Sequence, residues 1–253
     1  MKFSEIPELP KGWIVWIGCL LSGGIWLSGV QAGEVLSQVS TLESLSQGDY
    51  EGSKSIAKLK EAGDFGLGTF DRLDGEMVVL DGKFYRINVE GVATEVQEEE
   101  TTPFAVVCFF DAEKSWQISN VQTMEELWKQ LDEQLFTRNH FYAVRISGKF
   151  RKIRTRSIPP QSEPYRELAE VLKTQATFDL EEVEGVMVGF RCPVFLDGIN
   201  APGYHFHFIT KDRSTGGHVL AVDVDSAIVE LDRLSKFDLR LPDTESFLKN
   251  ETP

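Results

Sequence analysis

The sequence predicts a strand-rich α+β fold in which two β-sheets share one core and a few helices pack around them. Short apolar runs bounded by Gly, Pro, Asn or Asp recur along most of the chain, which is typical of strands. Apolar residues at helical spacing occur in two clear places only. No flexible linker divides the chain after its first 32 residues, so both sheets are expected to contribute to one core.

Residues 1–32 are predicted to form a secretory signal peptide. Lys11 is followed by an apolar stretch that continues to Val30, and Val30 and Ala32 supply the small side chains of a cleavage site. The alternative is an uncleaved anchor, because the stretch approaches the roughly 20 residues of a membrane span. Its several Gly and Ser residues favour cleavage after Ala32. The folded domain is then residues 33–253, and the protein is expected to be exported, or membrane-anchored if the leader is retained.

The first half of this domain is predicted to be mostly β-structure. Residues 34–47 are expected to form a short helix or a loose arm. Residues 76–80 and 83–89 are predicted to form a hairpin, because Asp81-Gly82 between two apolar runs is a strong hairpin signal. Further strands are predicted at residues 65–70 and 105–110.

Two helices are predicted. The first begins with the capping box of Thr123 and Glu126 and carries apolar residues at helical spacing. The second is expected to begin near Glu163 with Pro164 at its first position, and to point Tyr165, Leu168, Val171 and Leu172 inward. Strands are predicted around it, at residues 140–150 and in about five segments between residues 177 and 241.

The charge of the protein limits its partners. With 40 acidic and 26 basic residues, the formal net charge is −14. Such a protein repels nucleic acid and anionic lipid, so neither nucleic acid nor, after leader cleavage, a membrane is expected as a partner. Lys152, Arg154 and Arg156 share one face if their segment is extended. An arginine on that face could bind a carboxylate through two hydrogen bonds. For Lys152 and Arg154, a basic strand edge that prevents aggregation is an equally good interpretation.

The cysteines do not predict a metal site. Cys19 lies in the leader, and Cys108 and Cys192 lie in apolar, strand-like surroundings. Two buried free thiols are expected, with a disulfide as the alternative in an oxidising compartment. The absence of a C-x-x-C motif excludes zinc binding by cysteine.

Three of the four histidines lie within fourteen residues and predict a metal site on strands of the C-terminal half. His205 and His207 alternate with aromatic residues, so on a strand both imidazoles occupy one face. Gly216-Gly217 lets a turn bring His218 back on the neighbouring strand. Three protein ligands leave a coordination position open, as a catalytic zinc ion requires. His140, in an apolar stretch, is interpreted as structural.

Glu76 is a further candidate, at the mouth of the predicted hairpin. If it faces inward, its carboxyl group could transfer protons beside the metal ion. The alternative is an ordinary acidic residue of a turn.

Seven motifs occur in order along the domain, at residues 65–70, 73–77, 102–105, 153–157, 202–208, 212–213 and 216–220. Together they resemble the α-acetolactate decarboxylase family, and the resemblance covers almost the whole chain after the leader. It implies a two-sheet protein that commonly forms a homodimer and converts 2-acetolactate, a 2-hydroxy-3-keto acid, to acetoin and carbon dioxide. It also implies that the three histidines hold zinc, with Glu76 near the metal and Arg156 addressing the substrate.

The mechanism that the resemblance implies is chemically reasonable. Loss of carbon dioxide leaves an enediolate, whose negative charge a zinc ion stabilises. Arg156 orients the departing carboxylate, and protonated Glu76 returns a proton to carbon. Burial must raise the pKa of Glu76 for this, whereas the adjacent metal opposes that shift.

One departure concerns a second glutamate, which the family contributes from a carboxy-terminal tail. The tail of this chain is short, and Glu245 and Glu251 are its candidates, neither of them assigned. A shortened tail is expected to weaken proton delivery or to admit water.

Two other functions fit parts of the sequence. A cupin-like metal oxygenase also carries an H-x-H strand, but cupins place a carboxylate about four residues later, where this chain has Lys211 and then Asp212. Such an oxygenase requires iron and consumes oxygen. The second alternative is a degenerate, exported zinc-binding module without activity.

Overall fold

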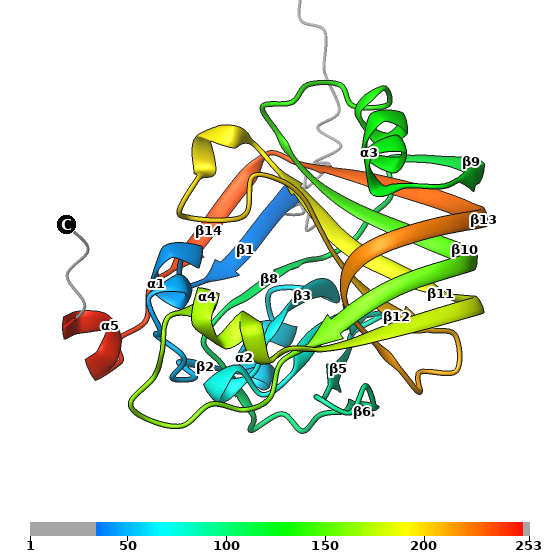
Figure 1. Ribbon diagram of the computed structural model, residues 1–253. Coiled ribbons are helices and arrows are strands. Elements are labelled where there is room, and N and C mark those ends of the chain that lie inside the picture. The colour runs from blue at the N-terminus through cyan, green and yellow to red at the C-terminus, as the bar shows by residue number, and fades with distance from the viewer. Residues whose placement is uncertain (1–33, 250–253) are drawn as a thin grey trace, which may run out of the picture. The chain divides into compact units, whose positions relative to one another are not determined.

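Two β-sheets form the framework of residues 34–249, the part of the chain that the computed structural model describes (Figure 1). The first sheet has seven strands in the order β14-β1-β8-β3-β4-β5-β6. Strands β1 and β14 pair in parallel, and the other neighbours are antiparallel. Its strands are β1 (Val35–Val39), β3 (Phe65–Thr69), β4 (Glu76–Leu80), β5 (Lys83–Ile87), β6 (Ala93–Glu95), β8 (Ala105–Cys108) and β14 (Lys236–Arg240).

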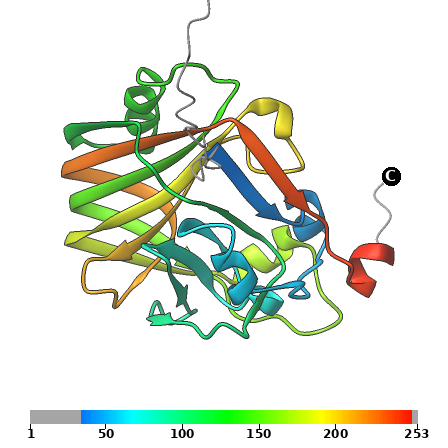
Figure 2. The ribbon, with the colours of Figure 1, turned by 180° about the vertical axis from the view of Figure 1, so that it is seen from behind.

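The second sheet has five strands in the order β10-β11-β12-β13-β9, and β13 also pairs with β10. Because of that additional pairing, β10, β11, β12 and β13 form a closed ring in which each strand pairs with two others. The strands are β9 (Lys114–Val121), β10 (Phe141–Ser157), β11 (Ala176–Cys192), β12 (Gly203–Thr210) and β13 (Gly216–Leu234). Figure 2 shows β10, β11 and β13 side by side from behind.

Short elements connect and cover the sheets. The helices are α1 (Leu42–Ser46), α2 (Ile56–Lys60), α3 (Met124–Asp132), α4 (Leu168–Val171) and α5 (Glu245–Lys249). Strands β2 (Lys54–Ser55) and β7 (Thr101–Thr102) form a small third sheet. No helix among residues 34–249 is long and apolar enough to cross a membrane. The predicted leader, residues 1–32, lies outside the described residues.

The two main sheets share one apolar core, as predicted. Leu67 and Val78 of the seven-stranded sheet pack in the same cluster as Val188 and Ile209 of the five-stranded sheet. Burying one such side chain contributes about 1.5–3 kcal/mol, so this cluster holds the sheets together. A second cluster lies between α3 and the five-stranded sheet, and a third lies between α2 and the seven-stranded sheet. The predicted fold class is confirmed.

The predicted hairpin and the first predicted helix are both observed. Asp81 and Gly82 connect β4 to β5 with φ of 52° and 74°, the left-handed values that a two-residue hairpin turn favours. Helix α3 begins after Thr123, whose hydroxyl accepts a hydrogen bond from the amide of Glu126. Cys108 and Cys192 are buried free thiols, as expected.

Two local expectations were wrong. Residues 34–47 are neither an arm nor one helix, because β1 is an interior strand between β14 and β8 and α1 follows it. The second predicted helix begins at Leu168 and not at Pro164. Tertiary hydrogen bonds hold the segment before it, since the amide of Gln161 donates to Arg72 O and the hydroxyl of Tyr50 donates to Arg166 O.

Candidate metal and active site

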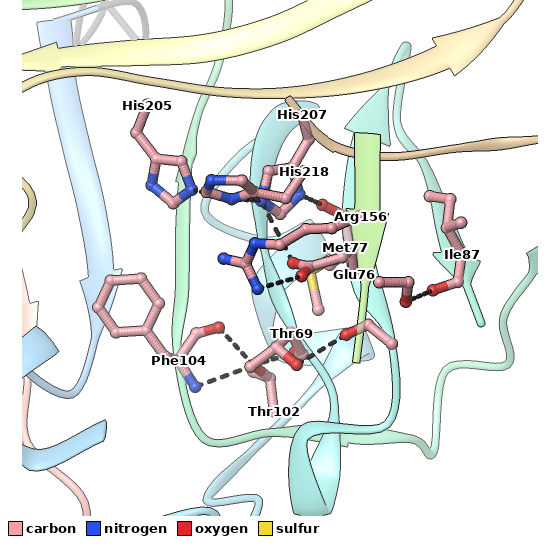
Figure 3. Close-up of polar contacts among 12 residues, drawn as sticks. Thr69, Glu76, Met77, Ile87, Thr102, Phe104, Arg156, His205, His207 and His218 are labelled. Atoms are coloured by element: carbon pink, nitrogen blue, oxygen red, sulfur yellow. Dashed lines mark hydrogen bonds and ion pairs between the residues drawn. The ribbon is translucent and has the colours of Figure 1, made fainter. Parts of the chain in front are cut away.

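The three histidines of the cluster converge on one point, as their spacing predicts (Figure 3). His205 and His207 leave the same face of β12, and His207 pairs directly with His218 across the β12–β13 ladder. Nε2 of His205 lies 3.1 Å from Nδ1 of His218, and that Nδ1 lies 3.3 Å from Nε2 of His207. One nitrogen from each ring lies within 4.8 Å of the others, which is close enough for one metal ion.

Gly216 and Gly217 act inside β13, not in the turn before it. Residues 211–215 make that turn, and the side chain of Asp212 accepts hydrogen bonds within it. A Cβ atom at Gly216 would lie 2.1 Å from Phe208 O, and one at Gly217 would lie 2.4 Å from Arg156 O. The glycine pair therefore lets β13 approach β12 and β10 closely, and this places His218 opposite His207.

The histidines are held in the neutral form that a metal ion binds. Burial lowers the pKa of His205 to about 4, with the Arg156 cation acting in the same direction. Burial also lowers the pKa values of His207 and His218 well below their usual range. Nδ1 of His207 lies 2.7 Å from the carbonyl oxygen of Met77, which can only accept. His207 therefore donates from Nδ1 and keeps a lone pair on Nε2.

Glu76 and Arg156 meet beside the histidines, although they come from different sheets. Glu76 begins β4, and Arg156 lies near the end of β10, directly opposite His218. Oε1 of Glu76 is 3.3 Å from Nη1 of Arg156, and its Oε2 is 3.4 Å from Nε2 of His207. Glu76 is buried, so it is not the exposed turn acid of the alternative interpretation.

The contact between Glu76 and Arg156 is close but not aligned as a hydrogen bond. Within the described residues, Oε1 of Glu76 and Nη1 of Arg156 are buried without a hydrogen-bond partner. Buried polar atoms normally have one, so both are available to a ligand. Burial raises the pKa of Glu76 to about 7, although the Arg156 cation opposes this shift. Around neutral pH the carboxyl group can therefore both give and take a proton.

These five side chains line a cavity of about 500 Å³. Its other walls are largely apolar, and they include Leu73, Phe104, Trp128, Ile158, Tyr204 and Leu220. A hollow of about 650 Å³ over the five-stranded sheet is larger, but none of the five side chains lines it. Convergent buried groups, and not volume, identify the smaller cavity as the candidate site.

Other candidate residues lie elsewhere. Lys152 and Arg154 are exposed and pair with Asp179, and β10 is bonded on both sides, so they form a strand face and not a strand edge. Glu245 lies in α5 beside Lys249, and it is not among the described residues that line the cavity. Glu251 lies outside the described residues.

Some features of the site escaped the sequence analysis. The Met77 carbonyl that orients His207 carries no side-chain signal. Trp128 occupies an apolar position of the first predicted helix, which by itself suggests a core residue, but it lines the cavity and is partly exposed. Ser157 has no signal in the sequence beyond its place in a motif, although its buried hydroxyl group makes a hydrogen bond beside Arg156.

Comparisons with known proteins place the chain beside one family. A family model described as Alpha-acetolactate decarboxylase matches residues 36–252. Relatives named alpha-acetolactate decarboxylase include one from Methanosarcina mazei, 44% identical over 87% of this chain and 76% of its own. Another, from Bacillus subtilis, is 40% identical over 83% of this chain and 82% of its own length.

Two solved structures have the same fold. The crystal structure of alpha-acetolactate decarboxylase from Bacillus subtilis strain 168 superimposes with a TM-score of 0.84 at 39% identity, over 86% of this chain and 93% of that one. A Staphylococcus aureus protein described as similar to alpha-acetolactate decarboxylase also gives a TM-score of 0.84. It is 32% identical, and the match covers 87% of this chain and 94% of that one.

Proposed function

Because the chain belongs to the alpha-acetolactate decarboxylase family, we propose that it is a carboxy-lyase that converts 2-acetolactate to acetoin and carbon dioxide. The observation that carries this proposal is the convergence of three neutral imidazoles, one carboxyl group and one guanidinium in a single cavity. Each of these groups has a task in the reaction.

Arg156 binds and orients the carboxylate of the substrate. Among the described residues it is the only Lys or Arg that lines the cavity, and its Nη1 has a free donor. A guanidinium fork can hold a carboxylate in one plane, which fixes the carbon–carbon bond that must break. The cation also offsets the repulsion between an anionic substrate and a protein of net charge −14.

The metal ion that we propose is zinc, held by His205, His207 and His218. The fit rests on three neutral rings whose nitrogens lie within 4.8 Å of one another, and on the fixed tautomer of His207. Bound there, zinc would act as a Lewis acid toward the negative charge that develops on the substrate oxygens.

Glu76 supplies the proton that completes the product. When the carboxyl group departs as carbon dioxide, the electron pair of the broken bond enters an enediolate. Protonation of the enediolate at the carbon that carried the carboxyl group gives acetoin. A carboxylic acid with a pKa of about 7 is a suitable donor for this step near neutral pH. Solvent then returns a proton to Glu76. The apolar walls of the cavity limit the access of water to the intermediate.

The decisive experiment measures acetoin. Purified residues 33–253, loaded with zinc, are incubated with racemic 2-acetolactate beside a His207→Ala variant. We expect rapid acetoin formation by the parent protein. In the variant we expect the slow spontaneous rate and lost zinc, because His207 supplies one of the three nitrogens of the proposed site. Zinc binding without acetoin would contradict the proposal and favour a binding module. Oxygen consumption with bound iron would favour the oxygenase.

We also propose export through the leader and assembly as a homodimer. The first rests on the composition of residues 1–32, and the second rests on family membership. Amino-terminal sequencing of the protein from its native cell tests cleavage after Ala32. Light scattering on the purified protein tests the dimer.

A further inference from the structure

The candidate site is divided between the two sheets. Glu76 belongs to the seven-stranded sheet, and Arg156 and the three histidines belong to the five-stranded sheet. The distance between the Glu76 carboxyl group and the Arg156 guanidinium therefore depends on how β10 sits against β4 and β5. A hydrogen bond that joins β10 to β4 or β5 beside the site therefore helps to fix that distance.

Two buried hydroxyl groups flank Arg156, and they differ in what they join. Thr155 Oγ1 donates to Gly216 O at 2.8 Å, which ties β10 to β13 within one sheet. Ser157 Oγ donates to Ile87 O at 2.7 Å, which ties β10 to β5 across the two sheets. Both side chains are fully buried, so water does not compete for either bond.

The acceptor of the Ser157 bond is directly connected to Glu76. Ile87 pairs with Glu76 in the β4–β5 ladder. A second bond lies nearby, because the amide of Gly75, the residue before Glu76, donates to Ile158 O at 3.2 Å. Ile158 follows Ser157, so this bond also joins the end of β10 to the chain beside Glu76. A Cβ atom at Gly75, where φ is +84°, would lie 2.4 Å from Ile87 O. Glycine there lets the chain entering β4 lie against the Ile87 carbonyl group, which is the acceptor of the Ser157 bond.

We propose that Ser157 is a positioning residue that sets the place of the Arg156 guanidinium relative to Glu76. It acts through Ile87 and touches neither substrate nor metal. This inference rests on the proposed function, in which Arg156 holds the carboxylate of the substrate while Glu76 delivers the proton. Both tasks require the two side chains at a fixed separation, and a shift of about 1 Å can lower a rate a hundredfold.

The test is Ser157→Ala in the zinc-loaded protein. We expect kcat for acetoin formation to fall about tenfold to a hundredfold while the zinc content stays the same. Binding of 2-hydroxy-2-methylbutanoate, an unreactive acid that offers its carboxylate to Arg156, should weaken. Binding of neutral acetoin should not change. A merely structural role would not separate these two ligands.

Ser44→Ala is the matched control. The Ser44 hydroxyl is also buried and donates to a single partner, Asp49 Oδ2 at 2.9 Å, but it joins α1 to its own following loop. It should leave kcat and both binding constants unchanged. Ser157→Cys keeps a weak donor of similar size and should restore part of the lost rate; it replaces Ser157→Ala if the alanine variant does not fold.

Combining Ser157→Ala with Arg156→Lys separates positioning from direct chemistry. If Ser157 acts only through Arg156, the two losses should not add. Additive losses, or an unchanged kcat in Ser157→Ala at full zinc occupancy, would overturn the inference. If the parent protein makes no acetoin, the proposed function fails separately. Equal binding of the unreactive acid by the parent and Ser157→Ala would then overturn the role of Ser157.

Discussion

Two arginines of one strand show how location decides what a residue can do. Arg154 and Arg156 both lie on β10, and their side chains are 49% and 13% exposed. Arg154 bonds both carboxylate oxygens of Asp179, at 2.9 and 2.8 Å, and its guanidinium is satisfied. Nη1 of Arg156 has no hydrogen-bond partner within the described residues. Of these two arginines, only Arg156 offers a buried, free donor to a ligand.

Their acidic partners differ in the same way. The hydrogen bond from Arg154 holds the pKa of Asp179 below its usual value, so this carboxylate stays charged in water. Burial raises the pKa of Glu76 to about 7 despite the Arg156 cation. Desolvation outweighs attraction only where solvent is excluded. The surface pair is therefore fixed in charge, whereas the buried pair can exchange a proton.

Replacing Glu76 should have the largest effect on the buried pair. Glu76→Gln preserves the shape of the side chain and removes the proton. We expect kcat to fall about a hundredfold to ten-thousandfold with zinc retained, because this is the usual contribution of a general acid. Acetoin assays with parallel metal analysis would measure it. A glutamine variant with the parental kcat would assign the proton donor elsewhere.

Arg156→Lys should have the next largest effect. Lysine keeps the positive charge but cannot form the planar, two-point contact with a carboxylate. We expect kcat/KM to fall about a hundredfold, since orientation and not charge is lost. Steady-state kinetics of the zinc-loaded variant measure this. If lysine restores the parental value, charge alone explains the role of Arg156.

The buried histidines should make the metal-free protein acid-sensitive. Because the pKa of His205 falls from 6.5 to about 4 on folding, the unfolded chain binds a proton more readily, and stability is lost as pH drops from 6.5 toward 4. His205 alone accounts for at most about 3 kcal/mol, since its side chain keeps partial access to solvent. Glu76 has the opposite effect, because its pKa rises from 4.5 to about 7 on folding and its contribution to stability is lost as pH rises through that range. The three imidazoles outnumber this one carboxyl group, so we expect a net loss of stability on acidification.

Urea unfolding of chelator-treated protein at pH 7 and 4.5 measures this loss. His205→Gln is the comparison, because it removes one titrating ring from the same strand. The variant should lose less stability on acidification than the parent. Equal losses would mean that burial does not keep His205 neutral.

The sequence predicted the parts of the fold and of the site that depend on local patterns. His205 and His207 share a face because side chains alternate along a strand, and Asp81-Gly82 specifies its own turn. It did not predict that β1 pairs with β14, whose partners Val35 and Lys236 lie at opposite ends of the described chain. It also left Arg154 and Arg156 equivalent in pattern. Their difference depends on where the seven-stranded sheet meets β10, which is a long-range property of the fold.

Arg154→Ala should have the smallest effect of all and completes the comparison. It removes the same functional group as a change at Arg156, two residues away on the same strand. An exposed ion pair contributes little because water and salt already screen both charges. We expect kcat and KM within about twofold of the parent and no resolvable change in Tm. A loss approaching that of Arg156→Lys would mean that Arg154 also reaches the substrate. Burial would then not be what separates the two arginines.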